Sequence, residues 1–149
     1  MTKKPKLPVI DPDDSLSALL IRVANRVERD CEAALHSHEI NPRQFSALAH
    51  LARNPGISAA ALARKVRLTP QSMSESLTLL VSSGLVKRSA PVAPGKSGTL
   101  EIAAEGLKVL TRAEPIVAHS NRQAFEPLSA KEQRRLKEML LLIARPTQA

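Results

Sequence analysis

Helix-start signals recur along this sequence and fix where its helices begin. Asn41 and Thr69 are each followed by proline, a pair that suits an N-cap residue and the first helical position. Ser58 and Ser129 are further residues of the N-cap type. Apolar residues at gaps of three and four follow each signal, as is typical of helices that bury one face. The sequence therefore predicts a mainly helical chain with helix starts at these four points.

Two of the predicted helices are short and lie next to each other. The first covers residues 59–66, and the second starts at Pro70 after a turn at Arg67 and Leu68. Gly84 suits the left-handed residue that closes the second helix. The positions expected to be buried in the second helix are Met73, Leu77, Leu80 and Val81. Two short helices joined by a tight turn are typical of a helix-turn-helix.

The pattern changes after the second short helix. Leu85–Ala90 and Thr99–Ala103 have the character of short strands, and the residues between them are rich in Pro and Gly. A β-hairpin directly after a helix-turn-helix is the winged-helix arrangement. We therefore expect a mainly α fold with a small β-hairpin wing, in which residues 40–103 form a winged helix-turn-helix lobe.

Three longer helices are predicted outside this lobe. The first begins near Asp14 or Ser15, and the second contains Pro115, where we expect a kink. Their apolar stripes are Leu16, Leu20, Val23, Val27, Cys31, Ala34 and Leu35 in the first, Leu107, Leu110, Ile116 and Val117 in the second, and Leu136, Met139, Leu140 and Ile143 in the last. The core of the winged helix-turn-helix lobe is too small to bury all of these stripes. Residues 15–38 and 104–145 are therefore expected to form a helical dimerisation region. Residues 1–14 are interpreted as a disordered basic tail.

The net charge of the chain limits the classes of partner that it is expected to bind. Lys and Arg number 22 against 14 Asp and Glu, which gives a net charge of +8. Residues 56–112 carry eight basic and three acidic residues, so most of the excess lies on the predicted lobe. The two Phe residues, with no Trp or Tyr, argue against single-stranded nucleic acid and RNA, which are gripped by aromatic stacking. Double-stranded DNA, which is bound through charge and groove contacts, remains as the expected partner.

The candidate DNA-binding residues divide into two groups. Polar side chains opposite the apolar stripe of the second short helix suit contacts to base edges, where Gln pairs with adenine and Glu accepts from cytosine. Basic side chains nearby suit phosphates, and a lysine at the wing tip is expected to reach the adjacent groove. The candidates are Arg64, Lys65, Arg67, Thr69, Gln71, Ser72, Ser74, Glu75, Thr78, Arg88 and Lys96.

The order of elements and several motifs resemble the MarR family of bacterial transcriptional regulators over roughly residues 15–145. The matching segments are Asn41-Pro42-Arg43-Gln44-Phe45, Leu62-Ala63-Arg64, Ser83-Gly84-Leu85-Val86-Lys87-Arg88, Gly106, and Leu128-Ser129 with Glu132. The resemblance implies a homodimeric repressor whose two recognition helices enter successive major grooves of a palindromic operator. It also implies a small aromatic effector, although no residue singles out a pocket for it.

The sequence departs from the family pattern at three places. Pro94 and Lys96 stand where the wing of the family usually carries Asp and Arg. Glu75 stands where the family often has Arg, and Arg67 where Gly is common. These departures bear on the target sequence and the affinity. They also motivate an alternative, in which the chain is a dimeric interaction protein of this fold without specific DNA binding.

A second alternative is a metal-sensing or redox-sensing regulator, based on Cys31 and the histidines. Cys31 lies on an apolar stripe, where cysteine is usually a small buried hydrophobe. His36 and His38 lack the spacing of three or four that aligns metal ligands on one helix face. No catalytic motif is present. We therefore expect no cofactor, no enzymatic activity and no membrane span, and a cytoplasmic protein.

Overall fold

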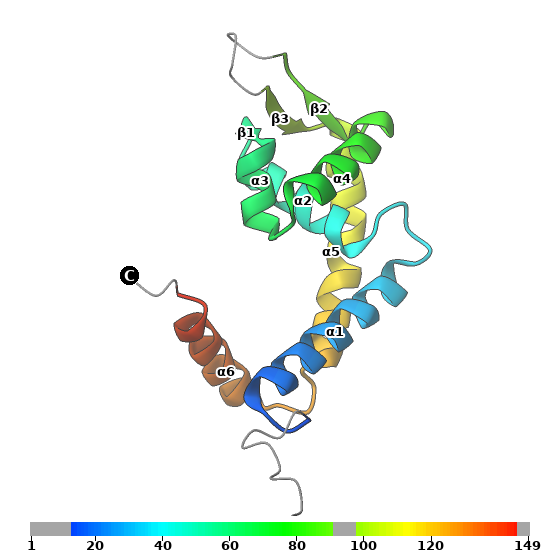
Figure 1. Ribbon diagram of the computed structural model, residues 1–149. Coiled ribbons are helices and arrows are strands. Elements are labelled where there is room, and N and C mark those ends of the chain that lie inside the picture. Colours follow the sequence, from blue (N-terminus) through cyan, green and yellow to red (C-terminus); the bar gives the residue numbers. More distant parts are fainter. Residues whose placement is uncertain (1–12, 91–97, 146–149) are drawn as a thin grey trace, which may run out of the picture.

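The computed structural model describes residues 13–90 and 98–145 of this chain of 149 residues. Within them the chain forms six helices and three short strands (Figure 1). In chain order they are α1 (Leu16–Leu35), α2 (Pro42–Arg53), β1 (Ile57–Ser58), α3 (Ala59–Val66), α4 (Pro70–Ser82), β2 (Val86–Arg88), β3 (Thr99–Ile102), α5 (Ala104–Ala124) and α6 (Ala130–Ile143). The mainly helical fold class with a small wing is confirmed.

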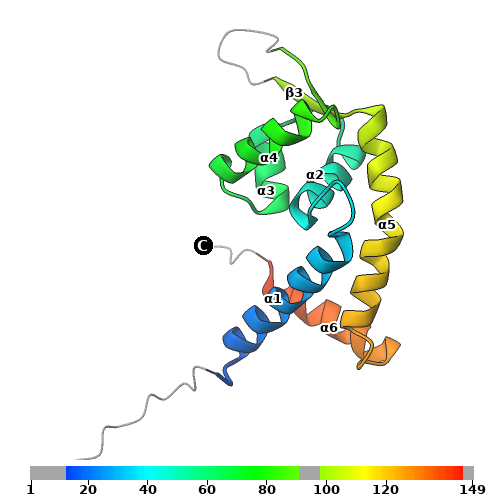
Figure 2. The ribbon, with the colours of Figure 1, turned by 90° about the vertical axis from the view of Figure 1, so that its right-hand side faces the viewer.

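The elements form a lobe and a set of long helices. Helices α2, α3 and α4 gather beneath the sheet, while α5 runs from the lobe to the far end of the molecule (Figure 1). Helix α1 packs mainly against α5. Helix α6 turns away from the end of α5 (Figure 2), and it contributes no buried residue. The predicted tail at residues 1–14 falls almost wholly outside the described residues.

The expected helix starts are all confirmed. The N-cap residues are Ser15, Asn41, Ser58, Thr69 and Ser129. Each side-chain oxygen accepts a hydrogen bond from the backbone N–H three residues further on, at 2.9–3.3 Å. The caps of α2 and α6 are full capping boxes, because the third helical residue also bonds back to the cap. These starts are local events, so short segments of sequence determine them.

The wing differs from the predicted hairpin. Strands β2 and β3 pair antiparallel as expected, but they cover only Val86–Arg88 and Thr99–Ile102. A third strand, β1, was missed; it pairs with β3 through Ile57 opposite Leu100, in the order β1-β3-β2. A two-residue strand has no periodicity of its own. It exists because Leu100 and its neighbours present a free edge beside it.

The core lies inside the lobe and along α5, and one predicted core position is wrong. Met73, Leu77 and Leu80 of α4 are buried, but Val81 is 38% exposed. Leu107, on the apolar stripe of the predicted dimerisation region, is also exposed, at 50%. Each of these two residues directly follows a buried one, and a step of one residue turns a helix by about 100°, away from the buried side.

The long helix α5 passes through Pro115 without interruption. Proline has no N–H to donate, so the carbonyl one turn earlier loses its helical partner. Pro115 is exposed, and water can therefore reach that carbonyl. The helix is packed on both sides of the proline, through Ala113 before it and Val117 after it, which favours its continuation.

Candidate nucleic-acid interface

The turn between α3 and α4 sets the direction of the second helix. Arg67 closes α3 with left-handed backbone angles, φ 56° and ψ 39°. The N–H of Leu68 then reaches back 3.0 Å to the carbonyl of Ala63, which completes the closure of α3. Leu68 is half-buried against the core, so the chain enters α4 at a fixed angle.

Thr69 and Ser72 form a paired hydroxyl cap at the start of α4. Thr69 Oγ1 accepts the Ser72 N–H at 3.1 Å and donates its own proton to Ser72 Oγ at 3.0 Å. Ser72 Oγ therefore keeps its proton for an outside acceptor such as a phosphate oxygen. The Thr69–Ser72 cap lies at the N-terminus of α4, which is the positive end of the helix dipole.

Four of the five candidate base-reading side chains lie together on the exposed side of α4, while the fifth, Ser72, is half-buried. Gln71, Ser74, Glu75 and Thr78 are all exposed, opposite the buried residues of the same helix. Gln71 Nε2 donates to Glu75 Oε1 at 3.4 Å. Thr78 Oγ1 donates to the Ser74 carbonyl at 2.9 Å, which leaves the oxygen lone pairs of Thr78 free. This face can both donate to and accept from base edges.

Four candidate phosphate-binding cations surround α4. Arg64, Lys65, Arg67 and Arg88 are exposed, and none of them forms an ion pair within residues 13–90 and 98–145. They lie on α3, the turn after it, and β2, and both α3 and β2 pack against α4. Since no carboxylate of the described residues pairs with them, their charge is available to phosphates. Lys96, the expected wing-tip contact, lies outside the described residues.

The base of the wing is closed by polar contacts beyond the last paired strand residues. Ser89 N–H donates to the Thr99 carbonyl at 2.9 Å, and the two hydroxyls lie 2.6 Å apart. Gly98 faces the Ser89 carbonyl so closely that a Cβ there would overlap it. The two strands therefore leave the lobe as one ribbon.

Lys87 is an exposed cation of β2 outside the candidate set. It lies opposite Glu101 in the strand register and forms no ion pair within the described residues. The Lys87-Arg88 dipeptide in a predicted wing strand was the signal for it. Because side chains alternate across a strand, Lys87 and Arg88 point to opposite faces of the ribbon.

The residues behind the sensor alternative do not assemble into a site in the described part of the chain. No group of three or more His, Cys, Asp and Glu side chains there is placed to hold a metal ion. Cys31 is buried, and both its burial and the nearby Glu28 carboxylate raise the pKa of its thiol. A raised pKa opposes the reactive thiolate form.

Across residues 13–90 and 98–145, every helix falls short of the length or the apolar character that a membrane span requires.

Comparison with known proteins identifies the fold. The sequence profile of the MarR family matches residues 38–97. The HTH-type transcriptional repressor Rv2887 of Mycobacterium tuberculosis is 35% identical over 128 residues, which cover 86% of this chain and 92% of that protein. The crystal structure of Rv2887 in complex with DNA gives a TM-score of 0.73 at 31% identity, and 89% and 100% of the two chains are covered. Its complex with salicylic acid gives a TM-score of 0.72 at 34% identity, with coverage of 89% and 98%. This chain belongs to the MarR family of winged-helix transcriptional regulators, which are not enzymes.

Proposed function

We propose that this chain is a homodimeric repressor that binds double-stranded DNA at a palindromic operator and responds to a small aromatic ligand. One observation carries the DNA-binding part of the proposal. An exposed hydrogen-bonding face on α4 is bordered by exposed cations on α3 and β2 that have no ion-pair partner within the described residues. The Rv2887 complex with DNA supports the same partner.

The division of labour within this interface follows from side-chain chemistry. Arg64, Lys65, Arg67 and Arg88 bind phosphates and set the register of the lobe on the duplex. Thr69 and Ser72 bind phosphate at the positive end of α4. Gln71, Ser74, Glu75 and Thr78 read base edges in the major groove. Lys96, which lies outside the described residues, is expected from its place in the sequence between β2 and β3 to contact the adjacent groove.

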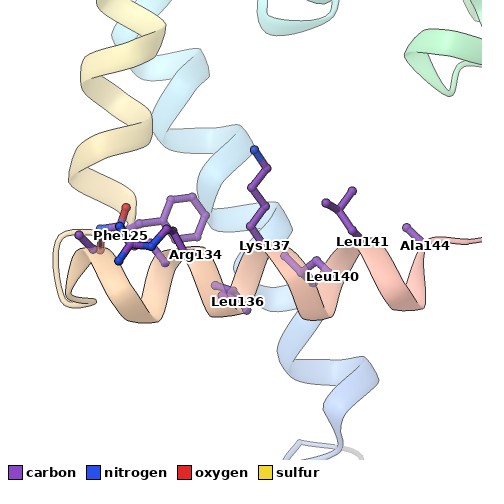
Figure 3. A pocket seen from close by; sticks show the side chains of 9 residues that line it. Phe125, Arg134, Leu136, Lys137, Leu140, Leu141 and Ala144 are labelled. Atoms are coloured by element: carbon purple, nitrogen blue, oxygen red, sulfur yellow. Dashed lines mark hydrogen bonds between the residues drawn. The ribbon is translucent and has the colours of Figure 1, made fainter.

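Exposed apolar side chains on the long helices support the proposal of a dimer. Leu16 is 81% exposed and Ile143 is 70% exposed. An open groove of about 640 Å³ runs between α6 and the end of α5, with Phe125 at one end and Leu140 and Leu141 toward the other (Figure 3). A second apolar groove lies between α1, α5 and α6 and shares Phe125, Leu136 and Leu140 with the first. A second copy of this chain, carrying the same stripes, is the occupant that would bury them.

The ligand class is proposed from the relative that binds salicylic acid. A small aromatic acid would act by binding one arrangement of the two lobes more tightly than another. Its effect on DNA affinity cannot exceed this difference in affinity. Titrating salicylate into the protein–DNA complex is the direct measurement, and release of the duplex is the expected result.

The test of DNA binding is a salt titration with the duplex that flanks the gene for this chain. We expect the logarithm of the affinity to fall linearly with the logarithm of the salt concentration. Arg64→Ala should reduce the slope by about one unit. Arg135→Ala is the matched control, because Arg135 lies on α6 and pairs with Glu138, and it should leave the slope unchanged.

The alternative of an interaction protein makes the opposite prediction. If binding is weak and indifferent to sequence at every salt concentration, and neither Gln71→Ala nor Ser72→Ala changes it, then specific reading by Gln71 and the phosphate contact of Ser72 are both excluded. Loss of binding on adding zinc or peroxide alone would instead favour the sensor alternative.

A further inference from the structure

Glu75 is the only acidic residue of α4, and it lies on the exposed side of that helix. It forms no ion pair with any residue of 13–90 or 98–145. A carboxylate brought up to a duplex is repelled by the phosphates unless a hydrogen-bond donor meets it. Glu75 therefore penalises every approach in which its oxygens find no donor on the DNA.

The structure pairs this carboxylate with an amide. Gln71 Nε2 lies 3.4 Å from Glu75 Oε1 and donates to it. The bond uses one of the two amide protons and fixes which end of the Gln71 amide faces Glu75. The other proton of Gln71 and the second oxygen of Glu75 stay free, so the pair offers a donor and an acceptor side by side. Both residues lie in the first two turns of α4, the part of a recognition helix that reaches base edges.

The edges of the base pairs decide what this combination can read. In the major groove, only the N4 amino group of cytosine and the N6 amino group of adenine donate. The adenine amino group has acceptors on both sides, N7 of the same base and O4 of thymine, and both repel a carboxylate. The cytosine amino group has only one acceptor neighbour, O6 of guanine, and the free Gln71 proton suits that oxygen.

We infer that Gln71 and Glu75 together read one C·G base pair in each half-site, with Glu75 accepting from cytosine N4 and Gln71 donating to guanine O6. Glu75 is thereby a specificity-determining residue: its main effect is to reject the other base pairs. This inference rests on the proposed function, since it requires that α4 enters the major groove.

The experiment is selection of binding sites from a random-sequence duplex library, with the full-length wild-type chain and three variants. The variants are Glu75→Gln, Glu75→Ala and the control Glu114→Gln, which removes a charge from an exposed site on α5. We expect one C·G pair per half-site in the wild-type and control selections. Glu75→Gln should prefer adenine at that position, since Gln pairs with adenine through two bonds.

Affinities for defined duplexes give the magnitude. Changing C·G to T·A at the selected position should weaken wild-type binding by about 5- to 150-fold per half-site. The same change should cost Glu75→Ala less than about twofold, while its discrimination at other positions persists. Circular dichroism of each variant checks that the fold is retained.

The outcomes separate this inference from the proposed function. Variants at Glu75 that select the wild-type site with unchanged discrimination would overturn the reading by Gln71 and Glu75 alone. A wild-type chain that enriches no sequence would overturn the proposed specific binding, and this inference with it.

Discussion

Two requirements at position 67 favour different residues: the left-handed backbone favours glycine, whereas a positive charge beside α4 requires a basic side chain. The φ of Arg67, 56°, lies in the left-handed region, where a residue with a Cβ costs about 1–2 kcal/mol. Glycine adopts this conformation freely. Arginine at this position brings an exposed cation to the edge of α4. Backbone strain at a surface residue is typical of a site kept for its side chain.

The first prediction follows from this conflict. Arg67→Gly should stabilise the fold by about 0.5–1 kcal/mol, because the relief of strain exceeds the added freedom of the unfolded chain. Thermal unfolding should show a midpoint about 1–4 °C higher. DNA binding should weaken and lose about one unit of salt slope.

The matched control is Arg64→Gly, the same exchange within the right-handed turns of α3. It should destabilise the fold by about 1 kcal/mol. Equal losses of stability in the two variants would contradict the strain at Arg67.

Cys31 gives a second prediction at this scale. Burial and the Glu28 carboxylate raise the pKa of its thiol, so less thiolate is present at neutral pH than in a free cysteine. Alkylation by iodoacetamide should be slower than that of glutathione at the same pH. It should accelerate as the pH rises through the elevated pKa. The urea-unfolded chain is the control, and it should react at the rate of a free thiol.

Sequence reasoning predicted which side chains of α4 are exposed but not the hydrogen bonds between them. The exposed positions of α4 follow from helical spacing, so Gln71 and Glu75 could be chosen from the pattern alone. Their hydrogen bond, like that of Thr69 with Ser72, depends on side-chain rotamers that a sequence pattern does not specify.

At the scale of elements, the junction of the wing with α5 depends on one glycine. Gly106 is buried in the first turn of α5, and a Cβ there would overlap the carbonyl oxygen of Leu85. That carbonyl accepts the Ala103 N–H at 2.9 Å. The close approach therefore holds the start of α5 to the residue that precedes β2.

We predict that Gly106→Ala destabilises the chain by about 1–3 kcal/mol, because the overlapping atoms are backbone and must move apart. Urea unfolding should show a lower midpoint. Lys108→Ala, an exposed change in the same helix, should stay within about 0.5 kcal/mol of the wild type. A wild-type midpoint for Gly106→Ala would mean that the junction is loose.

Elements were predictable where their signals are local. The five caps need only four or five consecutive residues, and each was placed correctly. Strand β1 and the exposure of Val81 and Leu107 depend on which surface packs nearby. The pattern of a single helix or strand does not contain that information.

At the scale of the whole molecule, the last prediction concerns the exposed apolar side chains of α1 and α6. Leu140 lines both apolar grooves. Leu140→Glu should convert the proposed dimer to a monomer of 16.1 kDa, because the dimer interface would then have to bury an unpaired carboxylate from each copy. Sedimentation equilibrium measures the mass, and operator affinity should fall with it.

Arg135→Glu is the control for this substitution, since Arg135 lines neither groove and its side chain is 72% exposed. It should leave the mass of the dimer unchanged. A wild-type chain that sediments as a monomer would contradict the proposed assembly.

The unbroken course of α5 has a mechanical consequence. Its 21 residues span about 30 Å from the wing to the apolar end of the molecule. A rod of that length that tilts by about 10° moves its far end by about 5 Å. Successive major grooves lie about 34 Å apart, so such a tilt in each half of the proposed dimer would move both α4 helices out of register with the duplex. A ligand that tilts α5 at its apolar end would therefore displace the DNA-contacting end by several ångströms.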